Sequence, residues 1–386
     1  MNSNLTPWAR RSGWLLLLLV LAAGAWMVWW HVGQRLVKED QRSLPATNAI
    51  TRPASLAVKP EVDSTNIFSD VLHRLPNGKS PDAARALCEK LRSDLNSLPR
   101  PEAARRIREF LDSGEDASTR LPFTLEADGT LKTAPSLRVF LLDLLGQLDP
   151  QSAAMVAEEL LKNPTSPDEW AVCLRNYALG SLNPAAADFL QEKLRAMWAN
   201  EAWRNDPSTG YLEAFDVVVF VGGTNLFPAL ASLVSDRGSP ALAHAAFMAL
   251  DRIAINDTTA TLSMLQSHPE FLAGHEATRA SFFARADVRD LQQREVLEKY
   301  LLNPVLGPAE LENFSGLFPN ANFMVSFNLL SQTQTPSSDT LARRDRAALQ
   351  TVESWLADSR FQRLQPQLQK IRTRLATFLN SPPVSR

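Results

Sequence analysis

The sequence predicts an all-α protein in which a single N-terminal transmembrane helix precedes a stack of antiparallel helix pairs. Three observations support this prediction. An uncharged apolar run stands near the amino end, dipeptides of a capping residue and proline recur along the chain, and apolar residues between them repeat at steps of three or four. The predicted parts follow in order: residues 1–12, a short basic tail; 13–32, the anchor; 33–65, a flexible linker; 66–330, the helical repeats; 331–338, a loop; 339–380, a capping helix pair; 381–386, a tail.

The apolar run extends from Gly13 to Trp30, GWLLLLLVLAAGAWMVWW, and is long enough to cross a hydrocarbon core as a helix. Its tryptophans at the carboxyl end suit the aromatic belt at a membrane surface. Ala23-Gly24-Ala25 also suits a signal peptidase, but the apolar residues continue to Trp30 and favour an uncleaved anchor. The residues expected to contact lipid include Gly13, Trp14, Leu15, Leu21, Trp26, Trp29 and Trp30.

The residues flanking this run favour one orientation. Arg10 and Arg11 form a short basic tail, which favours a cytoplasmic amino end, although Arg35, Lys38 and Arg42 nearly balance them on the other side. We therefore expect a single-pass protein of an inner or plasma membrane with its carboxyl part outside the cytoplasm. The linker is predicted from its prolines and small polar residues, which show no periodicity.

The composition of the chain limits its expected fold and function. The 386 residues are 45% hydrophobic and 21% charged with a net charge of −2, so a sizeable core is expected and nucleic-acid binding is disfavoured. Two cysteines, Cys88 and Cys173, make no disulfide framework, and a bridge between them is predicted to be out of reach. No spacing of metal ligands, nucleotide loop or nucleophile motif occurs, so we predict no metal, no cofactor and no catalytic residue.

Helix starts are the clearest local signal. A capping side chain accepts a free amide hydrogen, and proline fits the first helical position because its missing N–H is not needed there. The predicted starts are Ser80-Pro81, Asp149-Pro150, Ser166-Pro167, Asn183-Pro184 and Ser239-Pro240. Ser166 with Glu169 also forms a capping box. Starts at positions 149, 166 and 183 imply about 34 residues per helix pair, the size of a helical repeat.

Two stretches carry a resemblance. SPALAHAAFMALDRIA and SLRVFLLDLLGQLDPQSAAMVAEELL resemble the HEAT-like α-solenoid superfamily, in which antiparallel helix pairs stack into a curved rod. The resemblance covers residue 80 to about residue 330 and implies a right-handed α-solenoid. Tetratricopeptide repeats are the second interpretation because of the 34-residue spacing, but Leu174 follows Cys173 where that family has a Leu-Gly pair.

Three further features depart from plain helix pairs. LPFTLEADGTLKT, residues 121–133, alternates apolar residues around Asp128-Gly129 and predicts a small β-hairpin, with an irregular loop as the alternative. Gly222-Gly223 predicts a helix end rather than a phosphate loop. Near the carboxyl end, Pro366 is predicted to mark the start or a kink of the last helix.

The resemblance implies a membrane-anchored scaffold whose curved surface binds a protein or peptide. An enzyme with lyase-like activity in a solenoid groove is the alternative, and the sequence favours the scaffold without deciding between them. For this enzyme alternative, Trp170, Trp198 and Trp203 are the candidate groove residues. Glu213 and Asp216 are added because their spacing of three places both carboxylates on one helix face. Partner identity and oligomeric state are not encoded in recognisable motifs.

Overall fold

Side-chain caps define the starts of several helices. The computed structural model describes residues 64–77, 80–163, 165–222, 224–236, 238–322, 329–330 and 336–380. Ser80, Asp149, Ser166 and Ser239 each accept a hydrogen bond from the backbone N–H three residues later, with proline at the start of the helix that follows. These four predicted starts are confirmed. Asn183 instead caps a turn, and its helix begins at Ala186.

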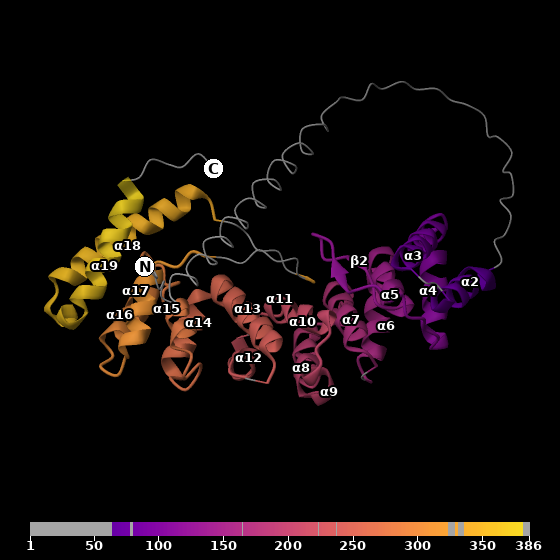
Figure 1. The fold of residues 1–386 in the computed structure, drawn as a ribbon, viewed down its shortest axis with the longest axis horizontal. Helices are drawn as coiled ribbons and strands as arrows, with labels where there is room; N and C mark the ends of the chain where they lie inside the picture. Colours follow the sequence, from indigo (N-terminus) through magenta and orange to yellow (C-terminus); the bar gives the residue numbers. More distant parts are fainter. Residues whose placement is uncertain are drawn as a thin grey trace, which may run out of the picture. The chain divides into compact units, whose positions relative to one another are not determined.

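The described fold is all-α apart from one small hairpin, and most of its helices form two layers (Figure 1). Helices of the two layers follow one another along the chain, and pairs such as α6 with α7 and α12 with α13 pack against each other. The first layer contains α5 (Leu137–Leu148), α7 (Pro167–Gly180), α10 (Thr209–Glu213), α11 (Asp216–Phe220), α13 (Pro240–Asn256), α15 (Glu276–Phe283) and α17 (Pro308–Leu317). The second contains α6 (Pro150–Leu160), α8 (Ala186–Ala199), α9 (Glu201–Asn205), η1 (Thr224–Leu226), α12 (Phe227–Val234), α14 (Thr258–Ser267) and α16 (Leu291–Leu302).

The amino end of this stack is closed by three helices and the hairpin. The helices are α2 (Ser64–Asn77), α3 (Pro81–Asn96) and α4 (Arg100–Ser113), of which α3 and α4 contact α5. Strands β1 (Thr124–Leu125) and β2 (Leu131–Thr133) pair antiparallel around Gly129, whose φ is 84°. The predicted hairpin is thus confirmed, and it packs on α5 because Phe123 and Leu131 are buried.

The carboxyl end of the stack is a helix pair. It contains α18 (Ser338–Ala357), the 3₁₀-helix η2 (Ser359–Leu364) and α19 (Gln365–Asn380). Pro366 stands at the second residue of α19, as predicted for a helix start. The pair lies against α17, and Trp355 joins the two parts because its ring lies 5.4 Å from Phe361 and 6.3 Å from Phe318.

The core continues from α2 to α19 as one cluster of buried apolar side chains. Close approach of helices depends on small residues: a Cβ at Gly180 of α7 would lie 1.9 Å from the carbonyl oxygen of Pro150 in α6. Gly222 follows α11 with a φ of 71°, in agreement with the predicted helix end. Cys88 and Cys173 are both buried and free, and burial raises the pKa of the Cys88 thiol to about 11.

The predicted anchor at 13–32 and the linker up to residue 63 lie outside the described residues. Among the residues that are described, no helix is long and apolar enough to cross a membrane. The first described helix begins at Ser64, two residues before the predicted start of the helical repeats.

Candidate functional site

Buried ion pairs connect successive helices of the first layer. Each pair joins an acidic residue to an arginine between 31 and 36 residues away, and every side chain involved is at most 9% exposed. We call this set the ion-pair ladder; its members are Arg138–Glu169, Asp143–Arg175, Asp216–Arg252 and Asp251–Arg285. Burial raises the pKa of the Asp143 and Asp251 carboxyls even though an arginine opposes the shift in each case.

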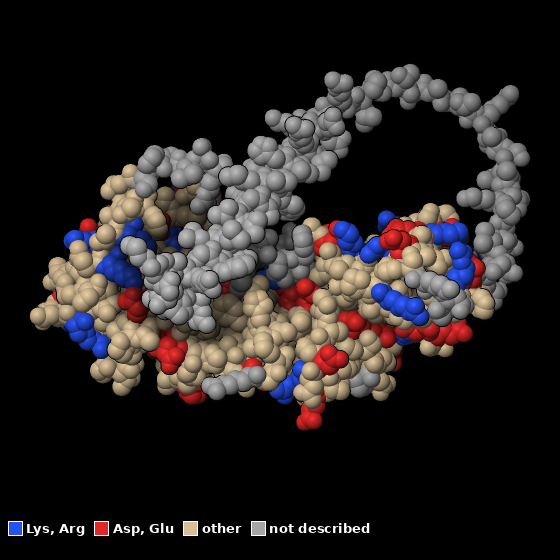
Figure 2. All heavy atoms as spheres, in the orientation of Figure 1, with Lys and Arg blue, Asp and Glu red and all other residues tan. Residues whose placement is uncertain are grey.

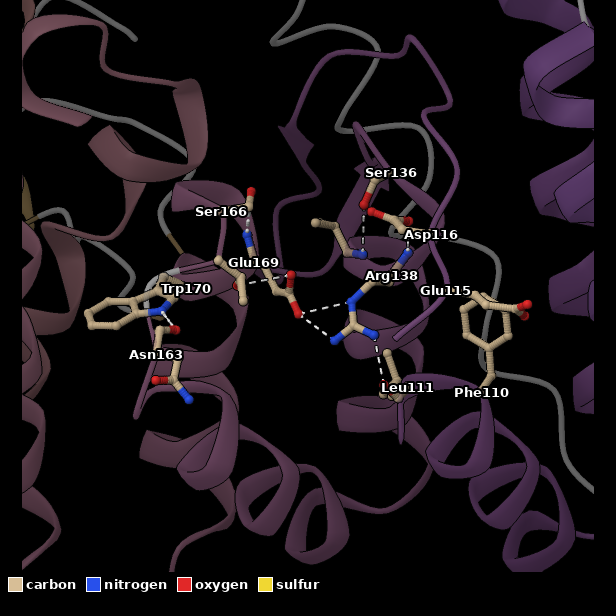
Figure 3. Close-up of polar contacts among 12 residues, drawn as sticks. Phe110, Leu111, Glu115, Asp116, Ser136, Arg138, Asn163, Ser166, Glu169 and Trp170 are labelled. Atoms are coloured by element: carbon tan, nitrogen blue, oxygen red, sulfur yellow. Dashed lines mark hydrogen bonds and ion pairs between the residues drawn. The ribbon is translucent and has the colours of Figure 1, made fainter. Parts of the chain in front are cut away.

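The pair Arg138–Glu169 shows how these groups are used (Figure 3). Two guanidinium nitrogens of Arg138 donate to Glu169 Oε1, at 2.7 and 3.1 Å, and a third donates to the carbonyl oxygen of Leu111 at 2.7 Å. The predicted capping box is therefore only half formed, since Ser166 accepts the N–H of Glu169 while the Glu169 carboxylate is bound by Arg138. The other carboxylate oxygen, Oε2, accepts the hydroxyl of Thr165 at 3.1 Å, so both oxygens of Glu169 have partners other than the backbone N–H of Ser166.

The pair Asp143–Arg175 holds the backbone of the hairpin. Asp143 Oδ1 accepts the N–H of Leu131 at 3.1 Å, and Arg175 Nη1 donates to the carbonyl oxygen of Gly129 at 2.7 Å. The two charged groups are 2.8 Å apart. One buried pair thus satisfies both a donor and an acceptor of a segment that lies on the first layer.

The next two pairs along the ladder contact the segment that follows α17. Arg285 Nη2 donates to the carbonyl oxygen of Asn322 at 2.7 Å. Asp216 Oδ2 accepts the N–H of Leu330 at 2.6 Å, while its Oδ1 accepts from Arg252 at 2.7 Å. Asn322 is thus bound just after α15, and Leu330, which is 114 residues from Asp216 in sequence, is bound at α11. The ladder therefore binds backbone amides and carbonyls of non-helical segments at three successive places.

A pocket of about 250 Å³ opens beside Asp216 and Arg252. Its walls come from α10, α11 and α13 and are mostly apolar, with Glu213 and His244 as further polar residues. The structure thus brings together Glu213 and Asp216, the two carboxylates grouped by their spacing. Burial raises the pKa of the Glu213 carboxyl to about 7, Asp216 adds to this shift and Arg252 opposes it.

Replacing Glu213 by glutamine is expected to change how stability depends on pH. A carboxyl whose pKa rises on folding stabilises the fold below its unfolded pKa, and that contribution is lost as pH rises towards 7. When the pH is raised from 5 to 8, the free energy of unfolding of Glu213→Gln should increase by about 1–2 kcal/mol relative to that of the unmodified protein, after allowance for the partial exposure of Glu213. Urea unfolding at both pH values measures this. Glu353→Gln, on the exposed face of α18, is the matched control, and an equal response of both variants would contradict the expectation.

The three candidate tryptophans lie elsewhere. Trp170 packs edge-on against Trp203 at 5.3 Å, and its Nε1 donates to the carbonyl oxygen of Asn163. Trp198 lies 5.4 Å from Phe215. Trp170 and Trp198 are at most 5% exposed, and none of the three tryptophans lines the pocket of Glu213. Their contacts are those of core residues between helices.

The residues that bind backbone were not found from the sequence. Arg138, Asp143, Arg175, Arg252 and Arg285 each lie within a helix or just after one, where a charged residue ordinarily faces solvent. A signal does exist, because aligning the chain with itself at an offset near 34 residues pairs acidic residues with arginines.

Within the described part of the chain, no group of three or more His, Cys, Asp or Glu residues is arranged to hold a metal ion. In comparisons with known proteins, no family model, no curated protein and no solved structure matches this chain.

Proposed function

We propose that this chain is a membrane-anchored scaffold of the HEAT-like α-solenoid type, and that its first layer binds a peptide segment of a partner protein. The observation that carries the proposal is the ladder, whose buried charged groups bind backbone at three places, in the hairpin and in the stretch after α17. Backbone amides and carbonyls occur in every peptide, so the same groups suit a segment of another protein.

Surface charge supports a protein partner over nucleic acid. Acidic and basic side chains are intermingled over the described surface that Figure 2 shows, and the net charge of the chain is −2. Strong binding to a phosphate backbone needs a basic stripe or patch. A carboxylate such as Asp216, whose role here is to accept a backbone N–H, suits a peptide better than a polyanion.

The partner-binding face is tested by photo-crosslinking in intact cells. A benzophenone amino acid replaces Ala241, an exposed residue of α13 that lines the pocket of Glu213. The control places the same amino acid at Ser232, which is exposed on α12 in the second layer. We expect one defined partner, identified by mass spectrometry, to be crosslinked from position 241 and not from position 232. Equal adducts from both positions, or none from 241, would refute the proposed binding face.

The anchor is proposed from the uncharged run of residues 13–30 in the sequence. Replacing Leu21 and Ala22 near its centre by arginine should cost about 2.5–3.5 kcal/mol for each charge inserted in a bilayer. The unmodified protein is expected to stay with membranes during alkaline carbonate extraction, and the double variant to be released. Replacing Leu44 and Ala46 in the linker by arginine is the control, which should leave extraction unchanged. Release of the unmodified protein would exclude the anchor.

A further inference from the structure

A half-buried carboxylate stands in the pocket between α10, α11 and α13 without a cation of its own. Glu213, the last residue of α10, forms no hydrogen bond or ion pair with any residue that the structure describes. In the same pocket Asp216 is bound by Arg252 at 2.7 Å, and the charges of these two groups cancel. Ionised Glu213 therefore adds one negative charge that nothing in the described pocket neutralises.

The walls around this carboxylate are largely apolar. Phe215 and Val219, both buried, line the pocket from the side of α11, and Ala245 and Met248, both half-buried, line it from α13. Among such side chains a carboxylate is poorly hydrated, and burial accordingly raises the pKa of Glu213 to about 7. A ligand that combines a cationic head with an apolar stem complements both the charge and the walls.

We propose that this pocket binds an arginine side chain of the partner segment, whose guanidinium pairs with Glu213 while its methylene groups lie against the apolar walls. This inference rests on the proposed function and adds a side chain that the bound segment must carry. Arginine is favoured over lysine because a guanidinium is more weakly hydrated than an ammonium and can donate to both oxygens of one carboxylate.

A small arginine probe tests the pocket directly. The probe is Nα-acetyl-arginine N-methylamide, titrated into the full-length protein in nonionic detergent and followed by ligand-observed NMR. Its control is the citrulline analogue, in which a neutral urea of similar shape replaces the guanidinium. We expect the arginine probe to bind at least about tenfold more tightly than the citrulline probe, because its hydrogen bonds to the carboxylate are charge-assisted. The difference should disappear in Glu213→Gln and persist in Glu353→Gln, which changes an exposed carboxylate on α18.

The pH dependence of the unmodified protein is a second measurement that needs no variant of Glu213. The arginine probe binds the ionised carboxyl, so its affinity should rise about tenfold between pH 6 and pH 8, as Glu213 loses its proton. Of the other charged groups, Asp216 and Arg252 pair with each other, and Asp168 of α7 accepts two hydrogen bonds at the start of α10. Protonated His244 would repel the probe in the same sense, so the titration is repeated with His244→Gln, in which the rise should remain.

Equal binding of the arginine and citrulline probes, an unchanged difference in Glu213→Gln, or an affinity that does not rise with pH would overturn the inference. Equal or tighter binding of the lysine analogue would contradict the choice of arginine. These failures are distinct from failure of the proposed function, because a partner without an arginine at this place would still be crosslinked from position 241. Conversely, loss of that crosslink would refute the binding face even if the probe bound to Glu213.

Discussion

Replacing Glu169 by alanine is expected to lower the free energy of unfolding by about 3–5 kcal/mol, because it leaves the buried guanidinium of Arg138 without its carboxylate. The side chains of both residues are at most 9% exposed, so water cannot take the place of the lost partner. Chemical denaturation of the full-length protein in detergent, followed by circular dichroism, measures the change.

Two further variants distinguish the loss of the buried ion pair from the general effect of removing a glutamate side chain. Glu159→Ala removes the carboxylate of an exposed pair with Lys162 and should change stability by less than about 1 kcal/mol. The double variant Arg138→Met with Glu169→Leu should recover much of the loss, because two apolar side chains need no compensating charge. A loss at Glu169 no larger than the loss at Glu159 would show that the ladder does not stabilise the fold.

Replacing Gly180 by alanine is expected to lower stability by about 3 kcal/mol. The new methyl group would meet the carbonyl oxygen of Pro150 at 1.9 Å and its carbon at 2.6 Å. Both are backbone atoms at the start of α6, so α6 and α7 must move apart and the packing between them weakens.

Gly316 provides the matched control, since it also lies in a helix but nothing is within 4 Å of a Cβ built there. Gly316→Ala should stabilise the protein by about 0.5–1 kcal/mol through helix propensity alone. Thermal unfolding of both variants measures the difference. Similar shifts of the two midpoints would mean that α6 and α7 are not in contact at Gly180.

Local patterns were enough to predict local structure. The caps at Ser80 and Ser239 join residues three apart, and the hairpin follows from Asp128-Gly129 between apolar residues. The spacing of Glu213 and Asp216 likewise placed two carboxylates at one pocket. In each case the interacting groups lie within a few residues of one another, so the sequence contains the whole interaction.

Interactions across helices could not be predicted in this way. The bond between Leu330 and Asp216 spans 114 residues, and nothing in either neighbourhood indicates the other. The tryptophans illustrate a related problem, because the rings of Trp170 and Trp203 suit a groove or a core equally well by composition. Only the stacking of the helices decides which side of each ring is covered.

The central claim is that charged groups of the first layer hold peptide backbone, as Asp216 holds the N–H of Leu330. The most direct measurement places a photoreactive diazirine analogue of leucine at position 330 of the full-length protein, since the analogue keeps the N–H and the shape of the side chain. After irradiation, mass spectrometry is predicted to find crosslinks to the hairpin and first-layer residues around the cavity, namely Asp128–Thr130, Gly146, Gln147, Arg175, Asn176 and Leu179. Crosslinks to second-layer helices instead of these residues would contradict the account.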